Sequence, residues 1–84
     1  MNAIYNLMGS ILEALAETGG EAPEGVMYAA LQGRVTHAQW TTAMRILRNC
    51  GLVTVSPACL VTITADGRET AAECAAAREE EAAR

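Results

Sequence analysis

The amino-acid sequence predicts a mainly α, α+β fold in which three core helices precede a short β-hairpin and a C-terminal helix. An apolar stripe of helical period runs through the first 17 residues, and a capping signal and a glycine bracket a second amphipathic stretch at 36–50. Two runs of β-branched residues, LVTV and LVTIT, follow directly. With 84 residues, 51% of them apolar, the chain is expected to form a single domain over 1–84, with a core only just large enough to fold unaided.

The first helix is expected over 3–17. Its large apolar side chains recur at spacings of three and one and so share one face; they are Ile4, Leu7, Met8, Ile11, Leu12 and Leu15. Burying six such side chains is worth on the order of 10 kcal/mol before entropy is subtracted, so this helix forms the core or a dimer contact. Gly19 and Gly20 end the helix, and the residues before Pro23 are extended.

A second helix is expected over 23–32. It begins at Pro23 or Glu24, because proline is tolerated at the first position of a helix and a carboxylate is favoured in the first turn. Its apolar side consists of Val26, Met27, Ala30 and Leu31. Tyr28 is expected to be at least partly buried.

The helix expected over 36–50 carries the clearest signals. Thr36 and Gln39 have the spacing of a capping box, and Gly51 stands where a helix ends with a residue of positive φ. One face is apolar and consists of Trp40, Ala43, Met44, Leu47 and Cys50. The opposite face is small, polar and cationic and consists of Ala38, Thr41, Thr42, Arg45, Arg48 and Asn49.

The hairpin is expected over 52–63, with SPAC as its turn, and Thr64 is expected to cap a last helix over 65–82. This last helix has no apolar side chain larger than Ala or Cys, so its end is expected to fray. Two interpretations stay open. The helix is a solvated tail, or it pairs with another chain through the strip of Ala71, Cys74, Ala75 and Arg78.

Three segments carry a family resemblance. LRNCGLVTV, the short turn and LVTITADGR, together with AALQGRVTHAQW upstream, resemble small prokaryotic winged helix-turn-helix regulators of the multiple-antibiotic-resistance and phenolic-acid-response types, over roughly residues 22 to 70. The resemblance implies a winged helix-turn-helix with 36–50 as its recognition-type helix and the hairpin as its wing. It also implies a short strand after the first helix, Leu31 closing the second helix, Gly33 in the turn and Val35 packed beneath it.

The first functional hypothesis is a small DNA-binding transcriptional regulator whose partner is double-stranded DNA. By position, the resemblance aims His37, Ala38, Thr41, Thr42 and Arg45 at base edges in the major groove, and Arg34 and Arg48 at phosphates. Residues 34–68 carry four arginines and one aspartate, but both flanks are acidic and 49–67 hold no cation. DNA binding is therefore expected to need a homodimer. The alternative that this face is only solvated stays open.

The second hypothesis is an acidic winged-helix protein-interaction module. It would be a subunit of a larger complex, or a phage or mobile-element protein that inhibits a host nucleoprotein enzyme. Its contact surface would be the face of Glu13, Glu17 and Glu21 together with the acidic C-terminal helix.

The sequence lacks the signals of an enzyme or of a cofactor or metal site. It holds no glycine-rich phosphate loop and no metal-ligand cluster, and the single His37 has no partner to serve a nucleophile. Three cysteines without CxxC spacing support neither a disulfide framework nor zinc. No apolar run is long enough to span a membrane, and the N-terminus lacks a basic secretion signal, so the expected location is the cytoplasm.

Overall fold

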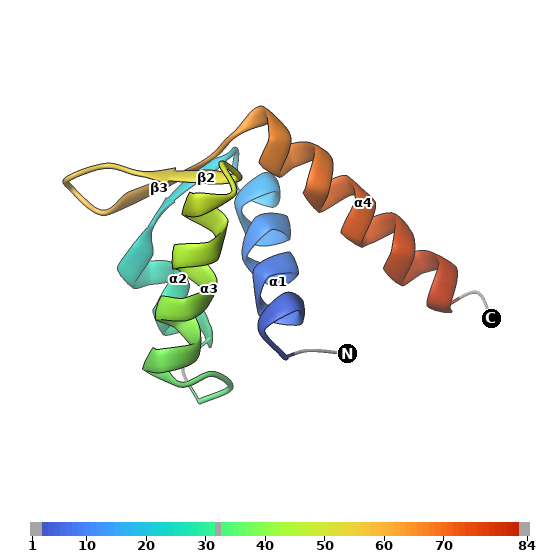
Figure 1. Ribbon diagram of the computed structural model, residues 1–84, viewed down its shortest axis with the longest axis horizontal. Coiled ribbons are helices and arrows are strands. Elements are labelled where there is room, and N and C mark those ends of the chain that lie inside the picture. Colours follow the sequence, from blue (N-terminus) through green and yellow to red (C-terminus); the bar gives the residue numbers. More distant parts are fainter. Residues whose placement is uncertain (1–2, 32, 83–84) are drawn as a thin grey trace.

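The computed structural model describes residues 3–31 and 33–82. Along the chain the elements are α1 (Ala3–Glu17), β1 (Glu21–Pro23), α2 (Glu24–Leu31), α3 (His37–Asn49), β2 (Val53–Val55), β3 (Leu60–Ile63) and α4 (Ala65–Ala82) (Figure 1). The strands form one antiparallel sheet in the order β1-β3-β2. This is the topology of a winged helix-turn-helix, which confirms the predicted fold class, including the short first strand that the resemblance implied.

Helix α1 is the central element, because it packs against both α3 and α4 (Figure 1). The predicted stripe faces the core. Leu7, Ile11, Leu12 and Leu15 are buried, and Ile4 and Met8 are half-buried against them. The sheet contributes Val53, Val61 and Ile63 to the same core, and α3 contributes Trp40, Ala43, Met44 and Leu47.

Helix α2 begins one residue later than the earlier of the two predicted starts. Pro23 pairs with Leu60 at the end of β1, so the helix starts at Glu24. Proline is tolerated there because β1 is an edge strand whose missing N–H costs no ladder bond. The helix ends at Leu31, whereas the prediction extended to residue 32, which lies outside the described residues. Tyr28 is half-buried against the core, as expected.

The predicted signals at both ends of α3 are confirmed. The Gln39 backbone N–H donates to Thr36 Oγ1 at 3.1 Å, and the Thr36 N–H donates to Gln39 Oε1 at 2.9 Å. Gly51 has a φ of 73°, which ends the helix without a Cβ clash. The helix proper is His37–Asn49, because Thr36 and Cys50 are its caps.

The hairpin is short. The Cys59 N–H donates to the Ser56 carbonyl at 2.9 Å and the Ser56 N–H donates to the Leu60 carbonyl at 3.0 Å, which closes the turn over four residues. Thr64 caps α4 as predicted, since its Oγ1 accepts from the Gly67 N–H at 3.0 Å.

Helix α4 lies against α1 along the strip of Ala71, Cys74, Ala75 and Arg78. Ala71 is 4% exposed, Cys74 and Ala75 are half-buried, and Arg78 donates to Glu13 of α1 at 2.6 Å. The strip is therefore engaged within the chain, which corrects both interpretations of α4, the solvated tail and the helix that pairs with another chain through this strip. The helix reaches Ala82, and the expected fraying falls on residues 83–84, outside the described residues. Among the described helices, none is long and apolar enough to cross a membrane.

Candidate nucleic-acid interface

The outer face of α3 is the surface that the first functional hypothesis assigns to DNA contacts. His37, Ala38, Thr41, Arg45 and Arg48 are exposed, and Thr42 is half-buried. The opposite face of the helix is held in the core by Trp40, Ala43, Met44 and Leu47, so packing fixes the direction in which the outer residues point.

Three of the predicted residues lie together in one groove. Thr41, Arg45 and Arg48 line a shallow groove of about 480 Å³ whose other lining residues are Glu24, Met44 and Asn49. Neither arginine forms an ion pair with any residue in the described part of the chain. The groove therefore combines two available guanidinium groups with a hydroxyl, which suits phosphate oxygens and the acceptor atoms of guanine.

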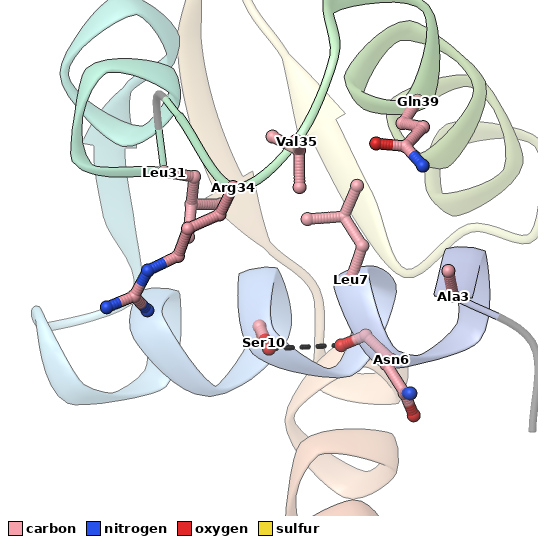
Figure 2. A pocket seen from close by; sticks show the side chains of 8 residues that line it. All are labelled: Ala3, Asn6, Leu7, Ser10, Leu31, Arg34, Val35 and Gln39. Carbon is pink, nitrogen blue, oxygen red and sulfur yellow. Dashed lines mark hydrogen bonds between the residues drawn. The ribbon is translucent and has the colours of Figure 1, made fainter.

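Arg34 lies apart from this groove. It stands in the helix-turn-helix turn, directly after Gly33 with its φ of 93°, and its side chain extends from the turn towards α1 (Figure 2). With Leu7, Leu31 and Val35 it lines a separate hollow of about 250 Å³ between α1 and the turn. Val35 packs against the core, as the resemblance implied. Arg34 is exposed and belongs to a different part of the surface from Arg45 and Arg48.

His37 stands at the start of α3 against an aromatic pair. Its ring lies edge-on to Tyr28 at 5.8 Å between centroids, and Tyr28 lies 5.6 Å from Trp40. These contacts connect the first exposed residue of α3 to the buried tryptophan. Packing on Tyr28 restrains the orientation of an otherwise exposed imidazole.

Glu24 has a role beyond the helix start that its position in the sequence indicated. Its Oε1 accepts a hydrogen bond from Trp40 Nε1 at 3.1 Å, and its backbone N–H donates to the Cys59 carbonyl at 2.9 Å. It thus joins the start of α2, the first turn of α3 and the turn of the wing. The available signal was the lone tryptophan on the apolar face of α3, because a buried indole N–H needs an acceptor.

The wing contributes no positive charge. No arginine or lysine lies between Asn49 and Gly67, and the Glu24 bond holds the turn of the hairpin against α2. Arg68, just beyond the wing, packs over Gly20, where an added Cβ would overlap its guanidinium group. The cations of the candidate interface are therefore those of α3 and the preceding turn, which are Arg34, Arg45 and Arg48.

The three glutamates of the second hypothesis differ in exposure and in ion pairing. The Glu13 carboxylate pairs with Arg78 at 2.6 Å and its side chain is only 15% exposed. Glu17 and Glu21 are exposed at the end of α1 and in β1. The structure therefore leaves Glu17 and Glu21 on an open surface and engages Glu13 between α1 and α4.

Within residues 3–31 and 33–82, no group of three His, Cys, Asp or Glu side chains could hold a metal ion. The three cysteines, Cys50, Cys59 and Cys74, are free thiols.

Comparison with known proteins gives a structural likeness. No family model matches the chain, and no curated protein matches it. A crystal structure of a proposed transcriptional regulator from Pseudomonas aeruginosa PA01 superposes with a TM-score of 0.76 at 22% sequence identity. The likeness covers 100% of this chain and 60% of that protein, so the chain spans about three fifths of its length. At this identity the likeness establishes the shared fold.

Proposed function

We propose that the chain is a small DNA-binding transcriptional regulator of the prokaryotic winged-helix type, with α3 in the major groove of double-stranded DNA. The observation that carries the proposal is the groove in which Thr41, Arg45 and Arg48 lie together on the outer face of α3. Unpaired guanidinium groups on the exposed face of a recognition-type helix suit this task. The structural likeness to a proposed transcriptional regulator adds support.

Each residue has a proposed role. Arg45 makes a bidentate contact to guanine, which is worth about 1–3 kcal/mol of discrimination. Arg48 and Arg34 contact phosphates and set the position of the helix. The remaining residues of the outer face, which approach base edges, are His37, Ala38, Thr41 and Thr42.

A homodimer is part of the proposal. One chain offers few phosphate contacts, because its wing has no cation and its net charge is −4. Two copies on adjacent half-sites, about 34 Å apart, would double these contacts.

The test replaces both groove arginines. Arg45→Gln with Arg48→Gln should lower the affinity for random duplex DNA at low salt by roughly tenfold or more, because two cationic contacts are lost. Ala72→Glu with Ala76→Glu on the exposed side of α4 changes the net charge by the same two units and should have little effect. Binding is measured by fluorescence anisotropy. If the wild-type protein shows no binding at low salt, the proposal is wrong.

The second candidate function is docking onto a protein through the acidic face, as a subunit of a larger complex or as a mobile-element inhibitor of a host nucleoprotein enzyme. It is favoured by the exposure of Glu17 and Glu21 on a surface other than the α3 groove. Under this function Glu17→Lys with Glu21→Lys should abolish the effect of the protein in a cellular assay, because docking onto its protein partner is lost. The Arg45 and Arg48 changes should leave that effect unaltered. The DNA-binding proposal expects the opposite result.

A further inference from the structure

Glu24 is the residue where the wing, α2 and α3 meet, and it places a carboxylate in the groove of Arg45 and Arg48. We propose that Glu24 is a specificity-determining residue, whose fixed negative charge weakens the phosphate contact of Arg48 in this groove and so makes DNA binding depend more on base contacts. The inference rests on the proposed function and adds to it the means by which non-specific binding is limited.

The position of the carboxylate is fixed from two sides. The backbone of Glu24 is held by the bond from its N–H to the Cys59 carbonyl at 2.9 Å, and its Oε1 accepts from Trp40 Nε1 at 3.1 Å. Trp40 is 3% exposed, so rotation of Glu24 away from it would leave a buried indole N–H unpaired. The charge therefore stays at the groove when DNA approaches.

The carboxylate stands near the two arginines without neutralising them. Glu24, Arg45 and Arg48 line the same groove, and no ion pair joins Glu24 to either arginine. A phosphate that enters gains attraction from the guanidinium groups and meets repulsion from the carboxylate. A base edge carries no net charge and avoids most of this repulsion. Discrimination between the two ligands follows from this difference.

The start of α2 would otherwise attract phosphate. The N-terminus of a helix carries partial positive charge and often binds anions. Glu24 is the first residue of α2 and supplies a carboxylate at that end itself. The neighbouring wing turn, which has no cation, likewise adds no affinity for phosphate. Both features lower non-specific binding on the same side of α3.

The test is Glu24→Gln, which keeps an oxygen acceptor for the Trp40 indole and removes only the charge. We expect its affinity for random duplex DNA at low salt to rise about fivefold, and the slope of log affinity against log salt to steepen by about one unit. Glu21→Gln is the matched control, because it removes an exposed carboxylate three residues away. Its affinity should stay within about twofold of wild type.

Trp40→Phe is a second variant that keeps the charge and removes the indole donor. Once the carboxylate is free to turn away, affinity for random DNA should rise by less than in Glu24→Gln, by about twofold. Circular dichroism and thermal melting establish that each variant is folded.

The outcomes separate the two proposals. If wild type binds DNA and folded Glu24→Gln behaves like Glu21→Gln, this inference is overturned and the proposed function stands. If wild type binds random DNA and folded Glu24→Gln binds it about fivefold more tightly, the inference is supported. If neither protein binds at any salt concentration, both proposals are overturned.

Discussion

At Gly67, the first turn of α4 approaches the backbone of the wing so closely that no side chain fits. A Cβ at this position would overlap the carbonyl oxygen of Leu52 and come within 2.7 Å of Ile63 Cγ1. That carbonyl also accepts the Thr64 N–H at 3.0 Å, so it is fixed by the bond that joins the wing to α4. The glycine is needed here for close approach, since Gly67 has no positive φ.

Replacing Gly67 by alanine should therefore destabilise the protein by about 1–3 kcal/mol, because the neighbouring atom is backbone and has no room to move. In a domain of this size the melting temperature should fall by roughly 4 °C or more. Gly25→Ala is the matched control. It lies in α2 with nothing within 4 Å of an added Cβ, so it should be neutral or slightly stabilising. Equal melting temperatures for the two variants would contradict this prediction.

Hydrogen bonds predicted from the sequence were confirmed where the two bonded residues lie within four positions of each other. The capping box of Thr36 and Gln39 could be recognised because its geometry depends only on local spacing. The bond between Glu24 and Trp40 spans 16 positions, and the pair of Glu13 and Arg78 spans 65. Such contacts depend on how separate helices pack, which local spacing does not encode.

At the scale of elements, α4 is where the sequence was least informative. The absence of large apolar residues suggested that little of it would be buried. Small residues instead let it approach α1 closely, and an added Cβ on Gly9 would stand 3.6 Å from Cys74 Sγ. The small residues of α4 can be read from the sequence, but the helix on which they pack cannot. The direction in which α4 leaves the wing, at Thr64 and Gly67, places them against α1.

Ala71 and Ala72 provide a test of this packing. Ala71→Leu should destabilise the protein by about 1–3 kcal/mol, because the added atoms are forced between α4 and α1 where Ala71 is 4% exposed. Ala72→Leu makes the same change on the exposed side of the helix and should alter the stability by less than about 0.5 kcal/mol. Urea denaturation measures both. If the two variants were equally stable, α4 would not pack on α1 as described.

At the scale of the whole molecule, charge is separated along an elongated shape. The described residues extend over 42 × 28 × 21 Å, and α4 projects away from α3 at one end (Figure 1). The acidic side chains of α4 therefore lie away from the groove of Arg45 and Arg48. Under the proposed function, this separation lets an acidic protein present its cationic face to DNA.

The proposed phosphate contacts predict the salt dependence of binding. If Arg34 and Arg48 each neutralise one phosphate, log affinity should fall against log salt with a slope of about 1.8 per chain and about 3.6 for a dimer. Between 50 and 200 mM salt this is a loss of roughly 12-fold or 150-fold. Light scattering gives the mass of the free protein and so identifies which value applies. A slope near zero would contradict phosphate contacts at both positions.

Trp40 is the only tryptophan of the chain, and it reaches from the core to the edge of the groove through its bond to Glu24. Its fluorescence consequently originates from a single, known place. Unfolding should shift the emission to longer wavelength as the indole enters water, and DNA in the groove should change the intensity by altering the field around the carboxylate. The intrinsic fluorescence of Trp40 can therefore be used to follow unfolding and DNA binding in the groove without an added label.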